Sequence, residues 1–472
     1  MARGIFSPAS SELPVTRVRE PRSSACKGIT TLWEEKSMRT RVTSGALLVC
    51  ALSLVAACGG DDGNGGASGS ATPTVKGAKA IDVALLDKPA SGTVTYCTGK
   101  DTTGAKAKSV ADFNKRFASQ GLSAKLLEFS TSADEQRAQF VQRAQAKSPE
   151  CDIFFSDVVW TAEFASQNWV YDLTPYIQKR RVEFIPSTLE TAHYADRYWG
   201  VPKDTNAAFL FYREDQVKTP PATWQAVYQQ AKANDGIVYQ GAPYEGLTCD
   251  FLELAFAAGG KVLSDDGKKS QINSPQNLKA LQFMVDGIKS GAAPKAVTTY
   301  MEEESRRAFE SGKYAFMRNW SYAYALGNAK GSKVAHKFKV APFPTFEGGT
   351  SAAILGGHNL VVSAFSKNPK GAVQLINYLT SPEVEKVNAA KFSITPVLTA
   401  TYSDPEVQKA MPFADALKKN VESAHARPVS PVYPQISQAI YKNVNAALAG
   451  QMSPQDALKK ADSQINSALA TF

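Results

Sequence analysis

The chain has 472 residues, of which 43% are hydrophobic and 21% are charged, so it can bury a large core and is long enough for two lobes. The formal net charge is +9, but lysines and arginines are scattered among acidic residues and form no block of five or more like charges. This pattern is typical of solvated helix faces and excludes a nucleic-acid-binding role.

A short apolar segment near the N-terminus predicts export. Arg39 and Arg41 precede a run of small and apolar residues, 45–57, which ends directly before Cys58. A membrane-spanning helix needs about 18 apolar residues, and this run is shorter. Small residues followed by a cysteine are typical of a lipobox, where the signal is cut and the cysteine thiol receives a lipid.

The N-terminal part of the chain therefore divides into two segments. Residues 1–57 form the predicted signal and leader region, and translation is expected to start at Met38 rather than Met1, because the residues before it lie outside any normal signal peptide. Residues 58–79 are rich in Gly, Ser, Thr, Ala and Asp and are predicted to be a flexible tether. The lipid on Cys58 is expected to anchor the exported protein to the outer face of the cell membrane.

After the tether, strand-like and helical patterns alternate. Residues 93–98, 124–129 and 151–155 are rich in β-formers, and apolar residues at helical spacing separate them. Ser132 precedes the second helix as an N-cap, with Glu135 three residues later. Strands that alternate with helices over short connections predict parallel pairing with right-handed crossovers, and therefore an α/β lobe.

In such a sheet, ligands bind beyond the carboxyl ends of the strands. This rule selects residues 98–101, 130–137 and 156–160 as the rim of a binding site. A second set of α/β signals follows, and a final helix is expected over residues 453–472. The further strand-like and helical stretches are 206–341, 355–362 and 372–379.

Beyond the leader and Cys58, three cysteines remain: Cys97, Cys151 and Cys249. Export permits a disulfide. Cys97 and Cys151 lie on two predicted strands of one sheet, so one prediction is a disulfide between them, with Cys249 as a buried thiol; the other is three free, buried cysteines. The four histidines lie far apart in the sequence, so no metal site and no cofactor are expected.

The chain lacks the common catalytic motifs. It has no zincin motif and no G-x-S-x-G elbow, and its near-match to a P-loop, residues 99–106, lacks lysine after the second glycine. The acidic run 302–304 precedes Arg306 and Arg307, and ion pairing on a helix surface explains it without function. We therefore expect a binding protein rather than an enzyme.

Polar and aromatic side chains gather at the predicted strand ends. Sugars present fans of hydroxyls and weakly apolar C–H faces, so a sugar site needs fixed hydrogen-bonding groups and aromatic platforms. Each residue alone has a structural explanation, such as a helix cap for Asp157, core packing for Trp320 or a bulge at Gly356. Their joint recurrence favours sugar binding. The segments concerned are 157–164, 204–206, 244–246, 318–322 and 356–358.

Three further segments carry a family resemblance: Tyr198-Trp199-Gly200-Val201-Pro202, Phe211-Tyr212-Arg213, and residues 309–317 with Trp320. At these residues the chain resembles the extracellular carbohydrate-binding lipoproteins of ABC importers, the class that includes maltose-binding proteins. The resemblance covers about residues 92–472. Within that class, segments 157–165, 245–247 and 427–433 are most similar to the trehalose-recycling lipoproteins of mycobacteria and other actinobacteria.

The resemblance implies an α/β, two-lobed clamp of the periplasmic-binding-protein type, in which each lobe contains an α/β sheet and a multi-segment hinge joins the lobes. It predicts that polar side chains bond sugar hydroxyls, that a tryptophan stacks on a sugar ring, and that two glycines admit the ligand. For Arg427 a structural ion pair is an alternative. The implied substrate-binding residues are Asp157, Asn206, Glu245, Trp320, Gly356, Gly357 and Arg427.

Two features depart from the family pattern. His358 stands where a smaller or apolar residue is expected, and residues 98–103 match no family pattern, so the identity of the sugar stays open. The predicted lobe boundaries place 80–203 plus 350–398 in lobe 1, and 204–349 plus 399–472 in lobe 2.

The function that the sequence predicts is that of a monomeric substrate-binding lipoprotein. It would capture a trehalose- or maltose-like disaccharide by lobe closure and deliver it to the ABC permease subunits in the membrane. The alternatives are a binding protein for another solute, such as a peptide or polyamine, and an exported glycosidase.

Overall fold

The structure is a computed structural model, and it describes residues 74–85 and 88–471. The predicted leader 1–57, the lipid attachment site Cys58 and most of the tether lie outside the described residues. In the described part of the chain, no helix combines the length and apolar character needed to cross a membrane.

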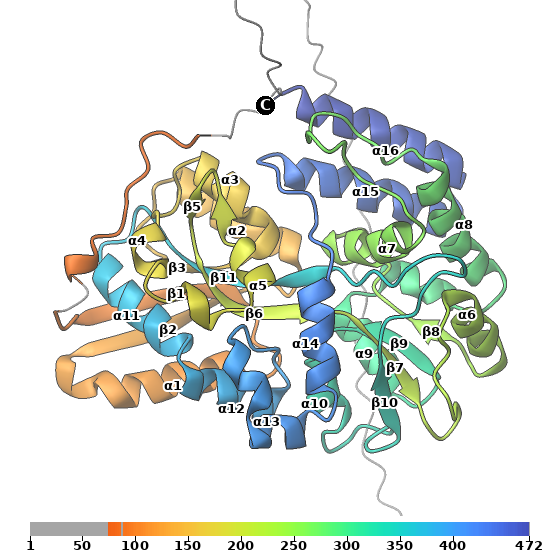
Figure 1. Cartoon of the computed structure of the whole chain (residues 1–472), viewed down its shortest axis with the longest axis horizontal. Helices are drawn as coiled ribbons and strands as arrows, with labels where there is room; N and C mark the ends of the chain where they lie inside the picture. The colour runs from red at the N-terminus through yellow and green to blue at the C-terminus, as the bar shows by residue number, and fades with distance from the viewer. Residues whose placement is uncertain (1–73, 86–87, 472) are drawn as a thin grey trace, which may run out of the picture. The chain divides into compact units, whose positions relative to one another are not determined.

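The first lobe is built on a five-stranded sheet (Figure 1). Its strand β1 pairs in parallel with both neighbours, as the alternation of strands and helices predicted. Strand β11 enters from the second lobe and runs antiparallel to both of its neighbours. In order across the sheet, the strands are β2 (Leu122–Phe129), β1 (Gly92–Gly99), β3 (Ile153–Asp157), β11 (Leu355–Val362) and β6 (Val201–Ala207).

Side chains point to alternate faces along each strand, and both faces of this sheet pack against core residues. Tyr96 of β1 packs in the same core as Phe113 of α1, whereas its neighbour Cys97 packs on the opposite face with Phe140 of α2. Ser132 caps α2 by accepting a hydrogen bond from the Glu135 backbone N–H. The helices around this sheet are α1 (Ala105–Phe117), α2 (Ala133–Gln145), α3 (Thr161–Ser166), α4 (Thr174–Ile177), α5 (Pro186–Glu190), α11 (Pro369–Leu379) and α12 (Pro382–Phe392), with a small hairpin of β4 (His193–Tyr194) and β5 (Arg197–Tyr198).

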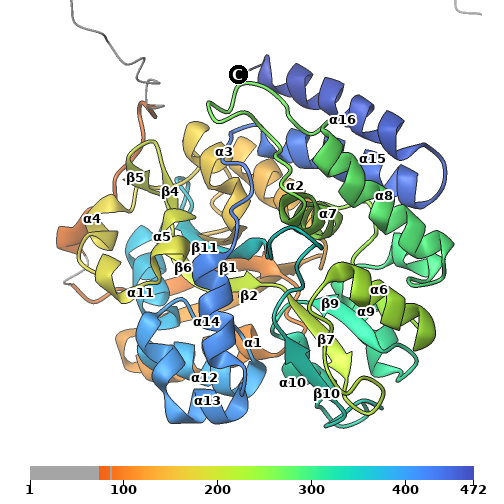
Figure 2. The ribbon, with the colours of Figure 1, turned by 45° about the vertical axis from the view of Figure 1, so that its right-hand side comes forward.

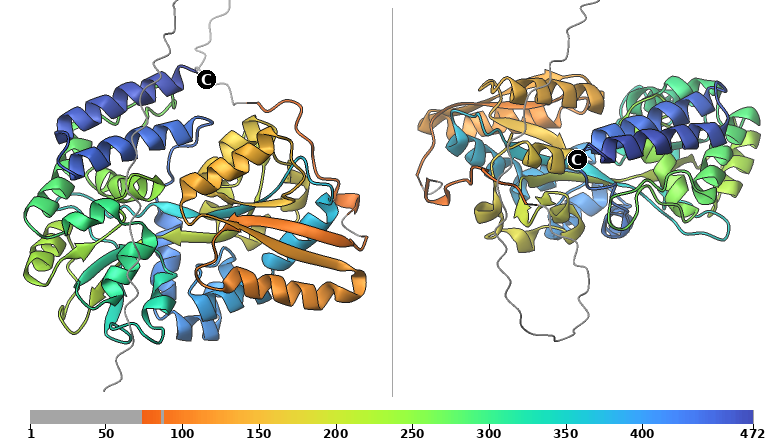
Figure 3. Two further views of the ribbon diagram at one scale, coloured as in Figure 1. Left: turned by 180° about the vertical axis from the view of Figure 1, so that it is seen from behind. Right: turned by 90° about the horizontal axis from the view of Figure 1, so that it is seen from above.

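The second lobe is built on a four-stranded sheet in which β8 is parallel to β9 and the other pairs are antiparallel. The final helix α16 buries its expected apolar face and lies beside α15 (Figure 3). The strands are β10 (Phe338–Ala341), β7 (Phe209–Arg213), β9 (Phe316–Asn319) and β8 (Ile237–Val238). The helices are α6 (Trp224–Ala233), α7 (Glu245–Ala257), α8 (Pro275–Lys289), α9 (Glu302–Glu310), α10 (Ala323–Gly327), α15 (Tyr433–Leu448) and α16 (Pro454–Leu469).

The chain passes between the lobes more than once. It leaves the first sheet after β6, enters β7 through Ala208, and returns between β10 and β11. Helix α14 (Ala414–Ser423), which follows α13 (Pro405–Ala410), packs against α5 and β6, whereas the next helix, α15, packs against α7 and α8. A third connection therefore runs through residues 424–432, beside α14 in the middle of Figure 2. Residues of α13 and α14 also contribute to the core of the second lobe, so the boundary at 398/399 stays a prediction.

Cys97 and Cys151 form a disulfide in the structure, with their Cα atoms 5.7 Å apart. Both residues are fully buried, Cys97 on β1 and Cys151 just before β3. Cys249 is a buried free thiol on α7. The bond therefore ties together two neighbouring strands of the first sheet.

Candidate functional site

A cavity of about 240 Å³ opens at the junction of the two lobes. The first lobe contributes the carboxyl end of β1 and the loop after it, the end of β3, the start of α2, and residues of β6 and β11. The second lobe contributes the N-termini of α7 and α9 and the segment after β9. The three rim segments expected from strand ends all contribute lining residues, because the carboxyl ends of parallel strands meet at one edge of the sheet.

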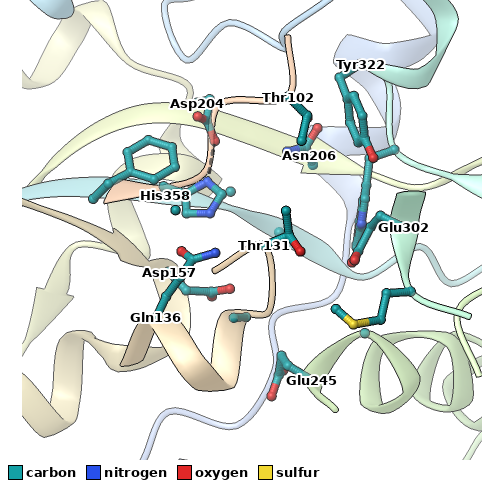
Figure 4. A pocket seen from close by; sticks show the side chains of 18 of the residues that line it. Thr102, Thr131, Gln136, Asp157, Asp204, Asn206, Glu245, Glu302, Tyr322 and His358 are labelled. Carbon is teal, nitrogen blue, oxygen red and sulfur yellow. Dashed lines mark hydrogen bonds and ion pairs between the residues drawn. The ribbon is translucent and has the colours of Figure 1, made fainter. Parts of the chain in front are cut away.

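All seven residues expected to bind substrate line this cavity, although they come from six separate parts of the chain. Figure 4 shows several of them together around the open space, with Asp157 and Asn206 on strands of the first lobe and Glu245 at the start of α7. The complete set is Asp157, Asn206, Glu245, Trp320, Gly356, Gly357 and Arg427.

Arg427 joins the two lobes by direct hydrogen bonds. Its Nη2 donates to Oδ1 of Asp157 at 3.2 Å, and its Nη1 donates to Oε1 of Glu245 at 2.6 Å. Asp157 belongs to β3 of the first lobe and Glu245 to α7 of the second, while Arg427 lies on the third connection. The structural ion pair considered for Arg427 is therefore present, and it lies inside the cavity.

Glu245 is buried and its carboxylate is fully engaged. Besides the bond from Arg427, Oε1 accepts a hydrogen bond from the Tyr433 hydroxyl at 2.5 Å, and Oε2 accepts one from the Ser437 hydroxyl. Burial, with a smaller contribution from the nearby carboxylates of Asp157 and Asp134, raises the pKa of Glu245 to about 7 against the opposing charge of Arg427. The carboxylate can therefore take up a proton near neutral pH.

A second contact between the lobes is made by Asp134, in the first turn of α2. Its Oδ2 accepts a hydrogen bond from the backbone N–H of Glu245 at 2.9 Å, and its Oδ1 accepts one from the Tyr441 hydroxyl at 3.2 Å. The N-termini of α2 and α7 therefore share one carboxylate, which complements the positive end of both helix dipoles. Burial raises the pKa of Asp134, while these hydrogen bonds oppose the shift.

Asp157 and Asn206 each accept hydrogen bonds within the protein and also line the cavity. Asp157 caps the short turn after β3 by accepting a hydrogen bond from the Val159 N–H at 3.1 Å, so the cap explanation holds for it. The Oδ1 of Asn206 accepts hydrogen bonds from the hydroxyls of Ser321 and Thr395. This arrangement orients the amide group of Asn206 on the cavity wall and leaves its NH₂ group without a hydrogen-bond partner among the described residues (Figure 4).

The two glycines of β11 have different roles. Gly357 has φ +121, and a Cβ there would lie 2.4 Å from the carbonyl oxygen of Asp204, so only glycine fits. A Cβ on Gly356 would lie 3.4 Å from the ring of Trp320, so this glycine leaves room for the indole. The register of β11 against β6 shifts between His358 and Asn359, one residue beyond the glycine pair.

Several lining residues were missed or misread from the sequence. The ring of His358 stacks on Phe155 with centroids 3.9 Å apart, and its Nδ1 lies 2.8 Å from Oδ1 of Asp204 (Figure 4). Lys106 Nζ lies 4.4 Å from the centre of the Phe155 ring. The unusual identity of His358 was the only sequence signal for this group, because its partners are distant in the chain.

The acidic run at the start of α9 is both a surface ion-pair cluster and part of the cavity wall. Arg306 pairs with Glu303 and Arg307 pairs with Glu304, as the sequence pattern indicated. Glu302 lines the cavity and makes no salt bridge among the described residues, and burial raises its pKa although the charge of Arg318 opposes the shift (Figure 4). Helical spacing alone could not show this second role.

The cavity is predominantly acidic. Its lining includes seven Asp or Glu side chains against three from Lys and Arg. Among the described residues, no cluster of three or more His, Cys, Asp or Glu is arranged to hold a metal ion. Two α/β lobes joined by several connections, with a polar and aromatic cavity at their junction, define a solute-binding clamp.

Comparison with known proteins places this clamp in a family. The pattern of the bacterial extracellular solute-binding proteins matches residues 100–386. A probable ABC transporter-binding protein from Deinococcus radiodurans is 37% identical over 365 residues, which make up 73% of this chain and 86% of the relative. The chain therefore belongs to the bacterial extracellular solute-binding protein family.

Two further matches show the range of ligands among similar proteins. The structure of maltose-bound MalE3 from T. maritima has a TM-score of 0.76 at 35% identity, covering 79% of this chain and 99% of that one. The sn-glycerol-3-phosphate-binding periplasmic protein of Rhizobium meliloti is 27% identical, covering 57% of this chain and 67% of the relative. The two-lobed fold and the likeness to maltose-binding proteins are confirmed, and proteins of this family bind solutes for ABC importers rather than transform them.

Proposed function

We propose that this chain is the sugar-binding component of an ABC importer and that it captures a neutral disaccharide of the trehalose or maltose type. The observation that carries the proposal is the cavity in which Arg427 joins Asp157 of one lobe to Glu245 of the other, beside the Trp320 ring. Planar donors and carboxylates hold vicinal hydroxyls, and an indole face suits a sugar ring. The maltose bound to the relative from T. maritima supports the same class of ligand.

The charge of the cavity argues against an anionic solute. A phosphate ester such as sn-glycerol 3-phosphate would enter among seven carboxylates with three lysine or arginine side chains to oppose them. A cationic solute such as a polyamine is the second candidate, favoured by this same acidic lining and by Glu302, which makes no salt bridge among the described residues.

The contacts of Glu245 argue against a glycosidase. A general acid must reach the leaving-group oxygen with a free carboxyl. Both oxygens of Glu245 are occupied by protein donors, and Asp157 accepts bonds from Arg427 and Val159. We infer that these carboxylates bind and orient the ligand.

Ligand capture is proposed to proceed by lobe closure, with the closed form recognised by a permease. We also propose that the protein is exported as a monomer and anchored to the outer face of the membrane by a lipid on Cys58. Mass spectrometry of the cell-derived protein tests the anchor, since a lipidated N-terminal peptide beginning at Cys58 is expected and an unmodified upstream sequence contradicts it.

A thermal-shift screen of the purified protein tests the ligand. The panel contains trehalose, maltose, sucrose, glucose, sn-glycerol 3-phosphate, spermidine and a tripeptide. Saturable stabilisation by one disaccharide, with the sugar recovered intact, is the expected result. Stabilisation by spermidine alone would show that the ligand is a cation rather than a sugar. Release of glucose from a disaccharide would show that the protein is an enzyme.

A further inference from the structure

Arg318 is a buried arginine beneath the tryptophan of the binding cavity. It lies on β9, and only 2% of it is exposed to solvent. Its Nε and Nη2 donate to the two oxygens of Glu253 at 2.9 and 2.5 Å, and its Nη1 donates to Oε1 of Gln240 at 2.7 Å. This bidentate pair and third bond fix the guanidinium plane in one orientation.

This guanidinium lies over the ring of Trp320. The Cζ of Arg318 is 4.0 Å from the centre of the Trp320 ring, within the distance of a cation–π contact. Trp320 itself is only partly buried, and it lines the cavity. One face of the indole therefore packs against the fixed guanidinium of Arg318, and the edge of the ring approaches Gly356.

The backbone of Trp320 is fixed separately from its ring. The Trp320 N–H donates to Oδ1 of Asn319 at 2.8 Å, and Nδ2 of Asn319 donates to the carbonyl oxygen of Glu302 at 3.2 Å. These bonds position the Cα of Trp320, whereas the indole is held by its own contacts, with Arg318 on one face and with the Glu302 side chain. The contact with Arg318 is the one that covers a face of the ring, so it contributes directly to the ring's orientation.

Burying the charged side chain of Arg318 costs desolvation free energy, which its partners must offset. Its partners are Glu253 and Asp250, both buried, and burial raises the pKa of each carboxyl. Burial opposes the charge of Arg318, but the two carboxylates outweigh it and raise its pKa. Apolar residues commonly replace buried ion pairs of this kind without loss of stability, so stability alone gives no reason for an arginine here.

We propose that Arg318 is a positioning residue that holds the Trp320 indole at the angle required for stacking on the ligand. The inference rests on the proposed function in one respect, because Trp320 must contact the bound sugar for the orientation to matter. The contact between Arg318 and Trp320 is itself independent of the ligand, and the test uses this difference.

Arg318→Lys is the primary variant, because lysine keeps the positive charge for Glu253 and Asp250 but lacks the planar group that stacks. Arg213→Lys is the matched control: Arg213 is a buried arginine of the same lobe, paired with Asp215, that does not line the cavity. Each variant is combined with Trp320→Ala, and trehalose and maltose are the probes in isothermal titration.

Arg318→Lys is expected to weaken binding of the sugar by about tenfold, the loss of one stacking contact. In the Trp320→Ala background the same change is expected to alter affinity less than twofold, because the ring on which Arg318 acts is gone. Arg213→Lys is expected to leave affinity unchanged in both backgrounds. Equal losses with and without Trp320 would overturn the proposal, since Arg318 would then act through another group.

Near-ultraviolet circular dichroism of the ligand-free proteins gives a readout that needs no sugar. Arg318→Lys is expected to change the tryptophan band, and the change should vanish in the Trp320→Ala background. An unchanged band overturns the proposal even if affinity falls. If Trp320→Ala binds both sugars normally, the proposed site fails while this spectrum still tests the contact. If Arg318→Lys does not fold, Arg318→Met combined with Glu253→Met and Asp250→Asn removes the charges of the arginine and of both its partners and takes its place.

Discussion

The carboxylate shared by the N-termini of α2 and α7 makes lobe closure measurable. Asp134→Asn keeps the size of the side chain but removes its charge, so the hydrogen bonds from the Glu245 N–H and the Tyr441 hydroxyl lose their charge-assisted character. A hydrogen bond to a charged group contributes about 1.5–3 kcal/mol and a neutral one about 0.5–1.5 kcal/mol. For a half-buried group with two such bonds, we expect the closed form to lose about 1–2 kcal/mol.

This loss should appear in the apparent affinity for the ligand. If the open form dominates without ligand, the free energy of closing is part of the observed binding free energy. Asp134→Asn should therefore raise the Kd for the sugar by about 5- to 30-fold in isothermal titration. Tyr441→Phe removes one bond and should show a smaller effect, while Glu135→Gln, the next residue on α2, should show none.

The pH dependence provides an internal check. Because burial raises the pKa of Asp134, this carboxylate becomes protonated at a higher pH than an exposed aspartate does. The wild type should then approach the Asn variant in affinity as the pH falls through that pKa, and the two should differ most above it. An unchanged Kd in Asp134→Asn at neutral pH, with lobe closure normal by small-angle X-ray scattering, would refute the reasoning.

Three other changes have defined outcomes. Trp320→Ala should weaken sugar binding at least about tenfold in titration without unfolding the protein, and unchanged affinity would reject the platform role. Glu245 has a folded pKa of about 7 against an ordinary 4.5, so the folded state binds more protons and the free energy of unfolding should fall as pH rises between these values, by up to about 3 kcal/mol. Urea melts of Glu245→Gln should lack this slope, and an identical slope contradicts the assignment. Replacing Cys97 and Cys151 by Ala opens a loop of 54 residues and should cost about 4 kcal/mol in urea melts, whereas an unchanged midpoint would mean that the thiols are free in the wild type.

Local patterns in the sequence were enough to predict the strands and helices of the first half of the first lobe. Runs of β-forming residues, apolar residues at helical spacing and the Ser132 cap predicted the parallel strands β1, β2 and β3 and the helix α2. The same rules selected the rim of the cavity, because the ends of parallel strands meet at one edge wherever the strands pair. These features depend on neighbours along the chain, which the sequence contains directly.

The contacts that make the site depend on residues far apart in sequence. Arg427 meets Asp157 across 270 residues and Glu245 across 182, and nothing in their local patterns specifies either pairing. The acidic run of α9 has the spacing of a surface helix, yet the packing of α9 against β9 turns Glu302 to the cavity. The contact of Arg318 with Trp320 was also not predicted, although residues two apart along a strand lie on the same face.

The sequence by itself determined the class of the protein: the alternating α/β pattern, the predicted export segment and the family-like motifs all follow from residues close together in the chain. Only the tertiary structure decided how the two lobes share charges across the cavity, with Asp134 between two helix N-termini and Arg427 between two carboxylates. The physical reason is that β11 inserts antiparallel between β3 and β6, and the third connection returns past them, which brings distant side chains within hydrogen-bonding distance. Periodicity reports which face of an element is buried, but the burial partner is chosen by the whole fold.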